Sequence, residues 1–224
     1  MTTTTFAGMP DEGLAFLEDL EERNTKAFFD ANRQLFKDQV QAPFAALVEA
    51  AAARLRRTVP GLGQPKVFRI YRDLRFSKDK TPYKLNCAAH LPGGYLSFSA
   101  DELFVGSGLY MPGPDQLKRF RAAVDDGDSG SKLESIVSAL RKNGYDVGAH
   151  EVLKTAPKGY PKDHPRIELL RYKGLITWKD WPAGAWLGTR RAKDRVIEFL
   201  QASKPMNEWL RKQVGRSTAV ERMR

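Results

Sequence analysis

The spacing of apolar residues changes twice along this chain, and this change constrains the fold more than any other feature. In the first third, apolar residues such as Leu14, Leu17 and Leu20 recur at helical spacing. Residues 43–57 add an alanine-rich run of high helix propensity, with Pro43 tolerated at the start of a new helix. Asn24 is the expected N-cap of a helix between these two runs. The chain therefore begins as a set of helices.

The middle of the chain has the short, β-branched and aromatic runs that are typical of strands. Residues 92–94, Pro-Gly-Gly, separate two of these runs and predict a hairpin. Strands are expected at residues 66–71, 84–91, 95–100, 103–110 and 175–178, and later helices at 116–124, 132–143, 190–201 and 205–214, with a short helix capped by Asp163. This order predicts an α+β fold, in which a central antiparallel meander packs with N-terminal and C-terminal helices. We expect a single domain over residues 1–224, with a frayed tail from about residue 216.

The composition excludes several classes of protein. Cys87 is the only cysteine, which rules out an internal disulfide, a cysteine-based zinc site and a CxxC redox pair. No run reaches the roughly 18 apolar residues of a membrane span, and the first residues lack the pattern of a signal peptide. We therefore expect a soluble, cytoplasmic protein without a membrane partner.

Positive charge is concentrated in parts of the chain. The formal net charge is +10, but residues 1–65 carry 7 basic and 9 acidic side chains. Residues 187–224 carry 10 basic and 4 acidic side chains. This asymmetry permits an anionic partner, including nucleic acid bound by the central and C-terminal basic regions, but it does not identify one.

The densest group of charges lies in residues 69–84. This segment holds six cations, two acids and two tyrosines; the charged residues are Arg69, Arg72, Arg75, Lys78, Lys80, Lys84, Asp73 and Asp79. In an extended chain, Phe68, Ile70, Arg72 and Leu74 share one face, on which Arg72 is the only charge. Since an isolated buried charge is costly, Arg72 must be paired or must reach into a pocket.

Two interpretations of the segment remain open. Arginine forks and mobile lysines suit the oxygens of phosphate or carboxylate groups, so the segment could build an anion-binding pocket. The expected ligand-binding residues are Arg69, Arg72, Arg75, Lys78, Lys80, Tyr83 and Lys84. Alternatively, Asp73 and Asp79 hold several of these cations in an ion-pair network that only fixes a loop.

The same segment carries a family resemblance. The pattern Arg69-x-x-Arg72-Asp73-x-Arg75-Phe76, followed by Asp79-Lys80 and Tyr83, resembles the signature of the microbial family catalogued as domain of unknown function 2461. The resemblance extends over most of the chain and includes Phe16-Leu17, residues 28–33, 108–112, 157–160 and 163–165. The family more usually has Trp-Phe where this chain has Phe28-Phe29. The resemblance implies a shared site at the signature residues, but no reaction, cofactor or ligand.

Catalytic candidates are weaker. Asp73 and Asp79 could serve a phosphoester- or nucleotide-processing enzyme, with the arginines stabilising developing charge. His164 could act as a general base or, at a predicted helix start, as a capping and packing residue. The three histidines lack paired metal-ligand spacing, so we expect no metal site, and no motif names a cofactor.

Overall fold

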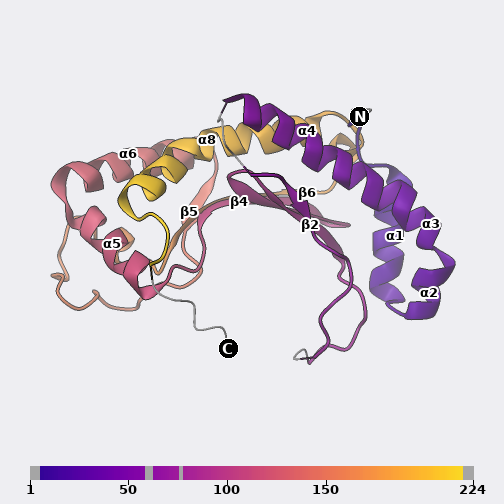
Figure 1. The fold of residues 1–224 in the computed structure, drawn as a ribbon, viewed down its shortest axis with the longest axis horizontal. Coiled ribbons are helices and arrows are strands. Elements are labelled where there is room, and N and C mark those ends of the chain that lie inside the picture. The colour runs from indigo at the N-terminus through magenta and orange to yellow at the C-terminus, as the bar shows by residue number, and fades with distance from the viewer. Residues whose placement is uncertain (1–5, 59–62, 76–77, 219–224) are drawn as a thin grey trace. The chain divides into compact units, whose positions relative to one another are not determined.

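A six-stranded antiparallel sheet confirms the predicted α+β fold. The computed structural model describes residues 6–58, 63–75 and 78–218. The strands are β1 (Lys66–Val67), β2 (Asn86–Leu91), β3 (Gly94–Ser99), β4 (Glu102–Leu109), β5 (Asp146–Gly148) and β6 (Leu175–Pro182). Their order in the sheet is β1-β2-β3-β4-β6-β5, so the first four strands form the predicted meander (Figure 1).

Helices occupy both ends of the chain and the segment between β4 and β6. They are α1 (Asp11–Glu22), α2 (Lys26–Ala31), α3 (Arg33–Leu35), the π-helix η1 (Phe36–Gln41), α4 (Ala42–Thr58), α5 (Pro114–Asp125), α6 (Gly127–Lys142), α7 (Ile167–Arg171), the 3₁₀ turn η2 (Ala185–Gly188) and α8 (Arg191–Gln213). No helix of the described residues is long and apolar enough to cross a membrane.

The chain divides into two compact units. The first comprises Met1–Val105 and Asp180–Gln201, and the second comprises Gly106–Lys179 and Ala202–Arg224. The expectation of a single domain stays a prediction.

The first unit packs its N-terminal helices through aromatic side chains. The Phe29 ring lies 6.1 Å from Phe16 and 5.1 Å from Phe36, measured between centroids, and all three are buried. Such tilted and edge-on pairs stabilise a core beyond the area that they bury. Gly13 lets α1 approach η1 closely, because a Cβ atom there would lie 2.2 Å from the carbonyl oxygen of Gln39.

The hairpin between β2 and β3 forms where the sequence predicts it. Leu91 pairs with Gly94, which leaves Pro92 and Gly93 as a two-residue turn. Gly93 has a φ of +86°, a conformation that glycine adopts without strain. Proline followed by glycine with positive φ is the sequence that a type II turn requires.

The pairing between the chain of β1 and that of β2 changes register. Val67 pairs with Ala89, and four residues further along Tyr71 forms an isolated bridge with Tyr83. From Ala89 to Tyr83 the stretch that precedes and includes part of β2 covers six residues, against four on the β1 side. The β2 side therefore has two more residues over this interval. The ladder is therefore interrupted around Leu85 and Asn86, in the manner of a large β-bulge.

The second unit has its own core between α5, α6, the β5–β6 pair and the end of α8. Its fully buried members include Phe120, Leu170 and Met206, and the Phe120 and Trp209 rings meet edge to face. Gly108 has a φ of +118°, and a Cβ atom there would lie 2.2 Å from the Leu175 carbonyl oxygen. Within the Gly-Ser-Gly sequence at residues 106–108, Gly108 thus permits close packing of β4 against β6.

Two helix predictions are wrong, the predicted strand at 66–71 is regular only over Lys66–Val67, and one short strand was not predicted. Residues 190–201 and 205–214 do not form two helices, because α8 continues through Pro205. Proline removes one helical hydrogen bond, but buried apolar residues keep helical spacing on both sides of it, and their burial outweighs this loss. Asp163 does not cap α7, which begins at Ile167 with Arg166 at the N-cap position. The short strand β5 has too few residues to show a pattern.

Candidate functional site

The predicted site segment folds back on itself as a short two-stranded ladder in the first unit. The Lys84 amide donates to the Ile70 carbonyl at 2.8 Å, and the Arg72 amide donates to the Pro82 carbonyl at 3.0 Å. Ile70 is buried, whereas Tyr71 is 42% exposed. Exposure alternates along residues 68–75 as the extended pattern predicts, and Arg72 lies on the less exposed face.

Arg72 is paired, as its place among apolar residues requires. Its guanidinium forms an ion pair with Asp79, and its Nε donates to the Tyr83 carbonyl at 3.0 Å. The Asp79 carboxylate also accepts from the Thr81 amide at 2.9 Å and from the Thr81 hydroxyl at 2.8 Å. These Thr81 bonds, together with Arg72, lower the pKa of Asp79. The pair closes the loop between the two strands.

Asp73 and Arg75 form a second pair within the same loop. Arg75 Nε donates to one carboxylate oxygen at 2.9 Å, and Nη2 donates to the other at 2.7 Å. This two-pronged contact holds the pKa of Asp73 well below its usual range. Asp73 and Asp79 are therefore carboxylates near neutral pH, with both oxygens of each already accepting hydrogen bonds.

Within the part of the chain that the structure describes, the remaining cations of the segment form no ion pair with a carboxylate. Lys80 Nζ donates to the Leu74 carbonyl at 3.0 Å, and Lys84 Nζ donates to the Arg69 carbonyl at 3.2 Å. Within the described ranges, the side chains of Arg69 and Lys78 form no hydrogen bond or ion pair. A carbonyl oxygen satisfies an ammonium donor but leaves its charge in place. The segment keeps a net positive charge.

The N-terminal helices hold the second strand of the segment in place. Asn24 Nδ2 donates to the Tyr83 carbonyl at 3.0 Å, and the Tyr83 amide donates to Asn24 Oδ1 at 3.1 Å. The Tyr83 ring stacks on Phe29 at 4.0 Å between centroids. The prediction that Asn24 caps α2 is wrong. Thr25 is the N-cap residue, because its hydroxyl accepts from the Phe28 amide. The side-chain amide of Asn24 instead pairs with the Tyr83 backbone, as the backbone of a neighbouring strand would.

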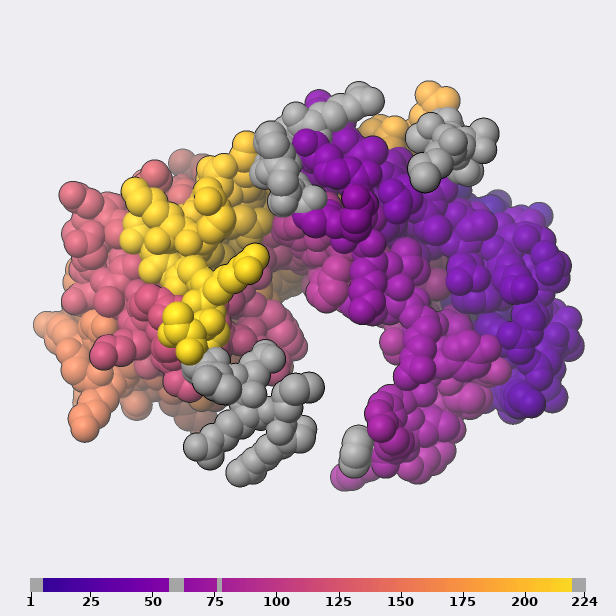
Figure 2. All heavy atoms as spheres, in the orientation of Figure 1, coloured from indigo at the N-terminus to yellow at the C-terminus, as the bar shows by residue number. Residues whose placement is uncertain are grey.

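A second contact joins the region around Phe29 to the segment. Arg33 Nη1 donates to the Tyr71 hydroxyl at 3.2 Å, and Arg33 also pairs with Asp30. The ring of Tyr71 lies 5.3 Å from that of Tyr83. These contacts join residues 28–33 to the charged segment in one surface cluster, although the two lie far apart in the sequence. Figure 2 shows the segment beside the N-terminal helices, which are indigo.

An open groove lies where the ladder is interrupted. Its volume is about 420 Å³, and it is lined by Arg72, Asp73, Lys84, Leu85, Asn86 and Ser99. Asn86 Nδ2 donates to the Ser97 hydroxyl at 2.6 Å, and the Ser99 hydroxyl accepts from the Glu102 amide at 3.2 Å. The groove lies where the two additional residues interrupt pairing with the β1 side of the ladder, whereas Asn86 keeps its pairing with Ser99 on the other side.

A comparison with protein families places the chain. The model described as "conserved hypothetical protein (DUF2461)" matches residues 12–209. The chain belongs to the DUF2461 family. No curated protein matches the chain. The match spans both the segment at residues 69–84 and the helices that hold it.

In this DUF2461 chain, the predicted ligand-binding residues divide into groups. Arg72 and Lys84 line the groove, whereas Arg69, Arg75, Lys78 and Lys80 do not, and Tyr83 is buried against Phe29. Phe76, the last residue of the first signature block, lies outside the described residues. Leu85, Asn86 and Ser99 were missed by sequence reasoning. Leu85 and Asn86 lie where the ladder is interrupted, and predicting this interruption would have required knowing the register of both strands.

The weaker candidates have structural partners. His164 Nδ1 accepts from the Arg166 amide at 3.0 Å, so a neutral ring carries its proton on Nε2, which lies 3.1 Å from Asp125. Burial raises the pKa of the Cys87 thiol to about 12. Among the described residues, no group of three His, Cys, Asp or Glu side chains is placed to hold a metal ion.

Proposed function

We propose that this DUF2461 chain binds a small molecule that carries a phosphate or carboxylate group, in the groove lined by Arg72 and Lys84. The observation that carries the proposal is the pairing of the two acids. Asp79 closes the loop with Arg72, and Asp73 is held by both prongs of Arg75. Asp73, which also lines the groove, is thus engaged by Arg75, and among the described residues no carboxylate lies within ion-pair distance of Arg69, Lys78, Lys80 or Lys84.

The groove offers the donors that an anion needs. Lys84 presents an ammonium group that donates to the neutral carbonyl of Arg69, and Arg72 presents a guanidinium held at a fixed position by two acceptors. Fixed donors cost less conformational entropy when a ligand binds than mobile ones do. Arg69 lies outside the groove lining, but its charge helps to lower the pKa of Asp73, so it adds to the local positive potential.

Binding is better supported than catalysis on phosphoesters. A general base needs a carboxylate oxygen that is free to accept a proton. In this structure, the oxygens of Asp73 and Asp79 accept from Arg75, Arg72 and Thr81. Their lowered pKa values also make them weak bases. The phosphoester enzyme remains an alternative that requires these pairs to open.

Calorimetric titration of the full chain with inorganic phosphate and with citrate tests the proposal. Lys84→Gln removes one charge-assisted hydrogen bond and should weaken binding about tenfold. Lys66→Gln is the matched control, because Lys66 is an exposed lysine of β1 in the same unit and does not line the groove. It should leave affinity unchanged.

Two results would count against the proposal. Equal affinity of wild type and Lys84→Gln, with melting temperatures also equal, would mean that the groove does not bind the anion. A titration with a 20-nucleotide single strand separates the nucleic-acid alternative. Nucleic-acid binding through dispersed basic residues predicts an affinity that falls steeply between low and physiological salt and that both lysine variants weaken alike.

A further inference from the structure

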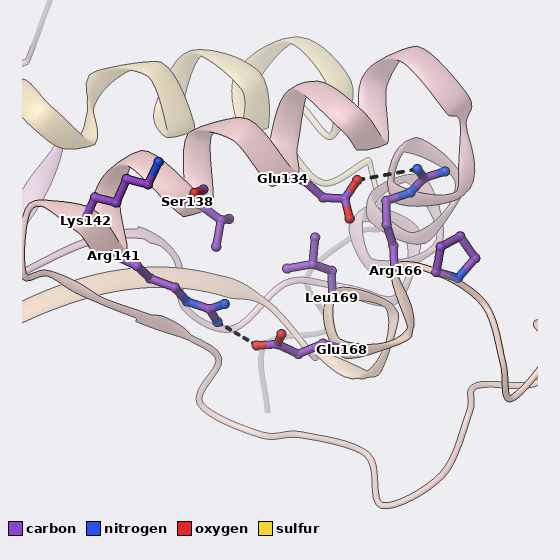
Figure 3. Close-up of a pocket in the computed structure, with 9 residues that line it drawn as sticks. Glu134, Ser138, Arg141, Lys142, Arg166, Glu168 and Leu169 are labelled. Carbon is purple, nitrogen blue, oxygen red and sulfur yellow. Dashed lines mark hydrogen bonds and ion pairs between the residues drawn. The ribbon is translucent and has the colours of Figure 1, made fainter.

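A second groove lies in the other unit, between α6 and residues 165–169. Its volume is about 490 Å³. Two ion pairs border it: Arg141 with Glu168 at 2.6 Å, and Arg166 with Glu134 at 3.6 Å. Figure 3 shows these pairs at opposite ends, with Leu169 between them and Lys142 at the Arg141 end. None of these residues belongs to the site already described.

Arg166 forms a fixed wall of this groove. Its Nε donates to the Val124 carbonyl at 2.6 Å, and its Nη2 donates to the Asp125 carbonyl at 2.9 Å. The side chain is only 11% exposed. Gly130 makes room for it, since a Cβ atom there would lie 2.4 Å from Arg166 Nε. With these bonds made, Arg166 serves the end of α5 rather than a ligand.

Arg141 has donors to spare. Among the described residues, its hydrogen bonds all run through Nη2, which contacts Glu168 at 2.6 Å, the Tyr172 hydroxyl at 3.4 Å and the Val147 carbonyl at 3.5 Å. The Tyr172 hydroxyl also donates to Glu168 at 2.6 Å. This network fixes the guanidinium and leaves Nε and Nη1 for another acceptor.

Two more donors of α6 line the groove with Arg141. Ser138 lies three residues before Arg141 and four before Lys142, so its side chain neighbours both of theirs on the helix surface. Within the described part of the chain, the side chains of Ser138 and Lys142 form no hydrogen bond or ion pair. One hydroxyl, the Nε and Nη1 donors of one guanidinium and one ammonium group therefore border the groove.

The geometry points to a binding site for a small carboxylate with an aliphatic body. The carboxylate would meet Ser138, Arg141 and Lys142, and the body would lie along Val137, Leu169 and Pro165, which form the apolar part of the lining. A carboxylate oxygen can accept one N–H from Nε or Nη1 of Arg141 and further bonds from Ser138 and Lys142, because both two-pronged edges of the guanidinium include Nη2, which already contacts Glu168. A phosphate dianion is less suited, because the carboxylates of Glu134 and Glu168 border the same groove and would repel the second charge.

Nuclear magnetic resonance titration of the full chain with hexanoate tests this site. Saturable shifts are expected at the amides of residues 134–142 and 166–169. Ser138→Ala and Lys142→Gln each remove one donor without touching either ion pair, and the lysine variant should weaken hexanoate binding about tenfold. Lys132→Gln removes the same charge from an exposed lysine of α6 that does not line this groove, and it should bind hexanoate as wild type does.

Three control ligands complete the experiment. Hexanamide keeps the aliphatic body without the charge, acetate keeps the charge without the body, and inorganic phosphate offers a different anion. All three should bind at least tenfold more weakly than hexanoate at these amides. Equal binding of hexanamide, equal binding of phosphate, or the same loss in Lys132→Gln and Lys142→Gln would each overturn the assignment, as would the absence of saturable shifts. The site does not depend on the groove at Arg72 and Lys84, whose failure would leave this result unaffected.

Discussion

Arginine side chains pair with oxygen acceptors both in the Arg69–Lys84 segment and in the groove between α6 and residues 165–169. The two regions differ in how far apart the paired residues lie in the sequence. In the segment, Arg72 pairs with Asp79 seven residues away, and Arg75 pairs with Asp73 two residues away. In the groove, Arg141 reaches Glu168 across 27 residues, and Arg166 reaches the Val124 carbonyl across 42. Short-range pairs shape a loop, whereas long-range pairs hold elements together. The comparison predicts that equivalent mutations have unequal effects on stability.

The largest difference is expected between two arginines. Arg166→Met removes hydrogen bonds to the Val124 and Asp125 carbonyls from a side chain that is 11% exposed, and it should cost about 3 kcal/mol of unfolding free energy. Arg75→Met breaks a pair on the exposed surface and should leave the unfolding free energy unchanged within error. Urea denaturation of both variants measures the contrast. Equal losses would show that the range of the pair does not matter.

A smaller effect is expected at two glycines of α6. Gly130→Ala places a methyl group 2.3 Å from the Val124 carbonyl oxygen and 2.4 Å from Arg166 Nε, so it should destabilise the protein by about 2 kcal/mol. Gly127 lies in the same helix, but a Cβ atom there would meet no atom within 4 Å. Gly127→Ala should therefore stabilise the folded protein by up to about 1 kcal/mol. Opposite signs in thermal unfolding are the expected outcome, and a shared sign would contradict the close approach of Arg166.

The anchor between the N-terminal helices and the segment comes next. Asn24→Ala removes both bonds to the Tyr83 backbone and should cost about 1–2 kcal/mol. Gln34→Ala removes an exposed contact with Asp38 and serves as the control, with an expected loss below about 0.5 kcal/mol. Hydrogen exchange adds a local measurement. The Tyr83 amide should lose protection in Asn24→Ala but keep it in Gln34→Ala.

The smallest expected effect is on acid sensitivity. Hydrogen bonds from Arg141 and Tyr172 lower the pKa of Glu168, which is 4.5 in an unperturbed chain. A lowered pKa in the folded state gives stability that is present above pH 4.5 and is lost as the pH falls through the folded-state value. Glu168→Gln should therefore be less stable than wild type at pH 7, with the difference narrowing towards pH 3. A constant difference between pH 7 and pH 3 would contradict the assigned pair.

Features that depend on neighbouring residues could be predicted from the sequence. The alternation of residues 68–75 follows from strand geometry, and Arg72 had to be paired because its neighbours on that face are apolar. Pro92 and Gly93 fixed the hairpin because few turns accept that dipeptide at those positions. In each case, the deciding partners lie within a few residues.

Features set by distant partners could not be predicted. Asparagine is a common N-cap residue, but the side-chain amide of Asn24 forms hydrogen bonds with the Tyr83 backbone, 59 residues away. The groove at Lys84 depends on a two-residue change of register, which requires knowing both strands. Pro205 is expected to end a helix on local grounds, yet buried residues on both sides carry α8 past it.

The most direct test of the proposed anion site is a crystal of the full chain soaked in selenate, located by its anomalous signal. The account predicts a peak within hydrogen-bond distance of Lys84 Nζ and the Arg72 guanidinium, beside Asn86 and Ser99, and no peak there in Lys84→Gln crystals. Peaks confined to other surface cations, with this groove empty in wild-type crystals, would contradict it.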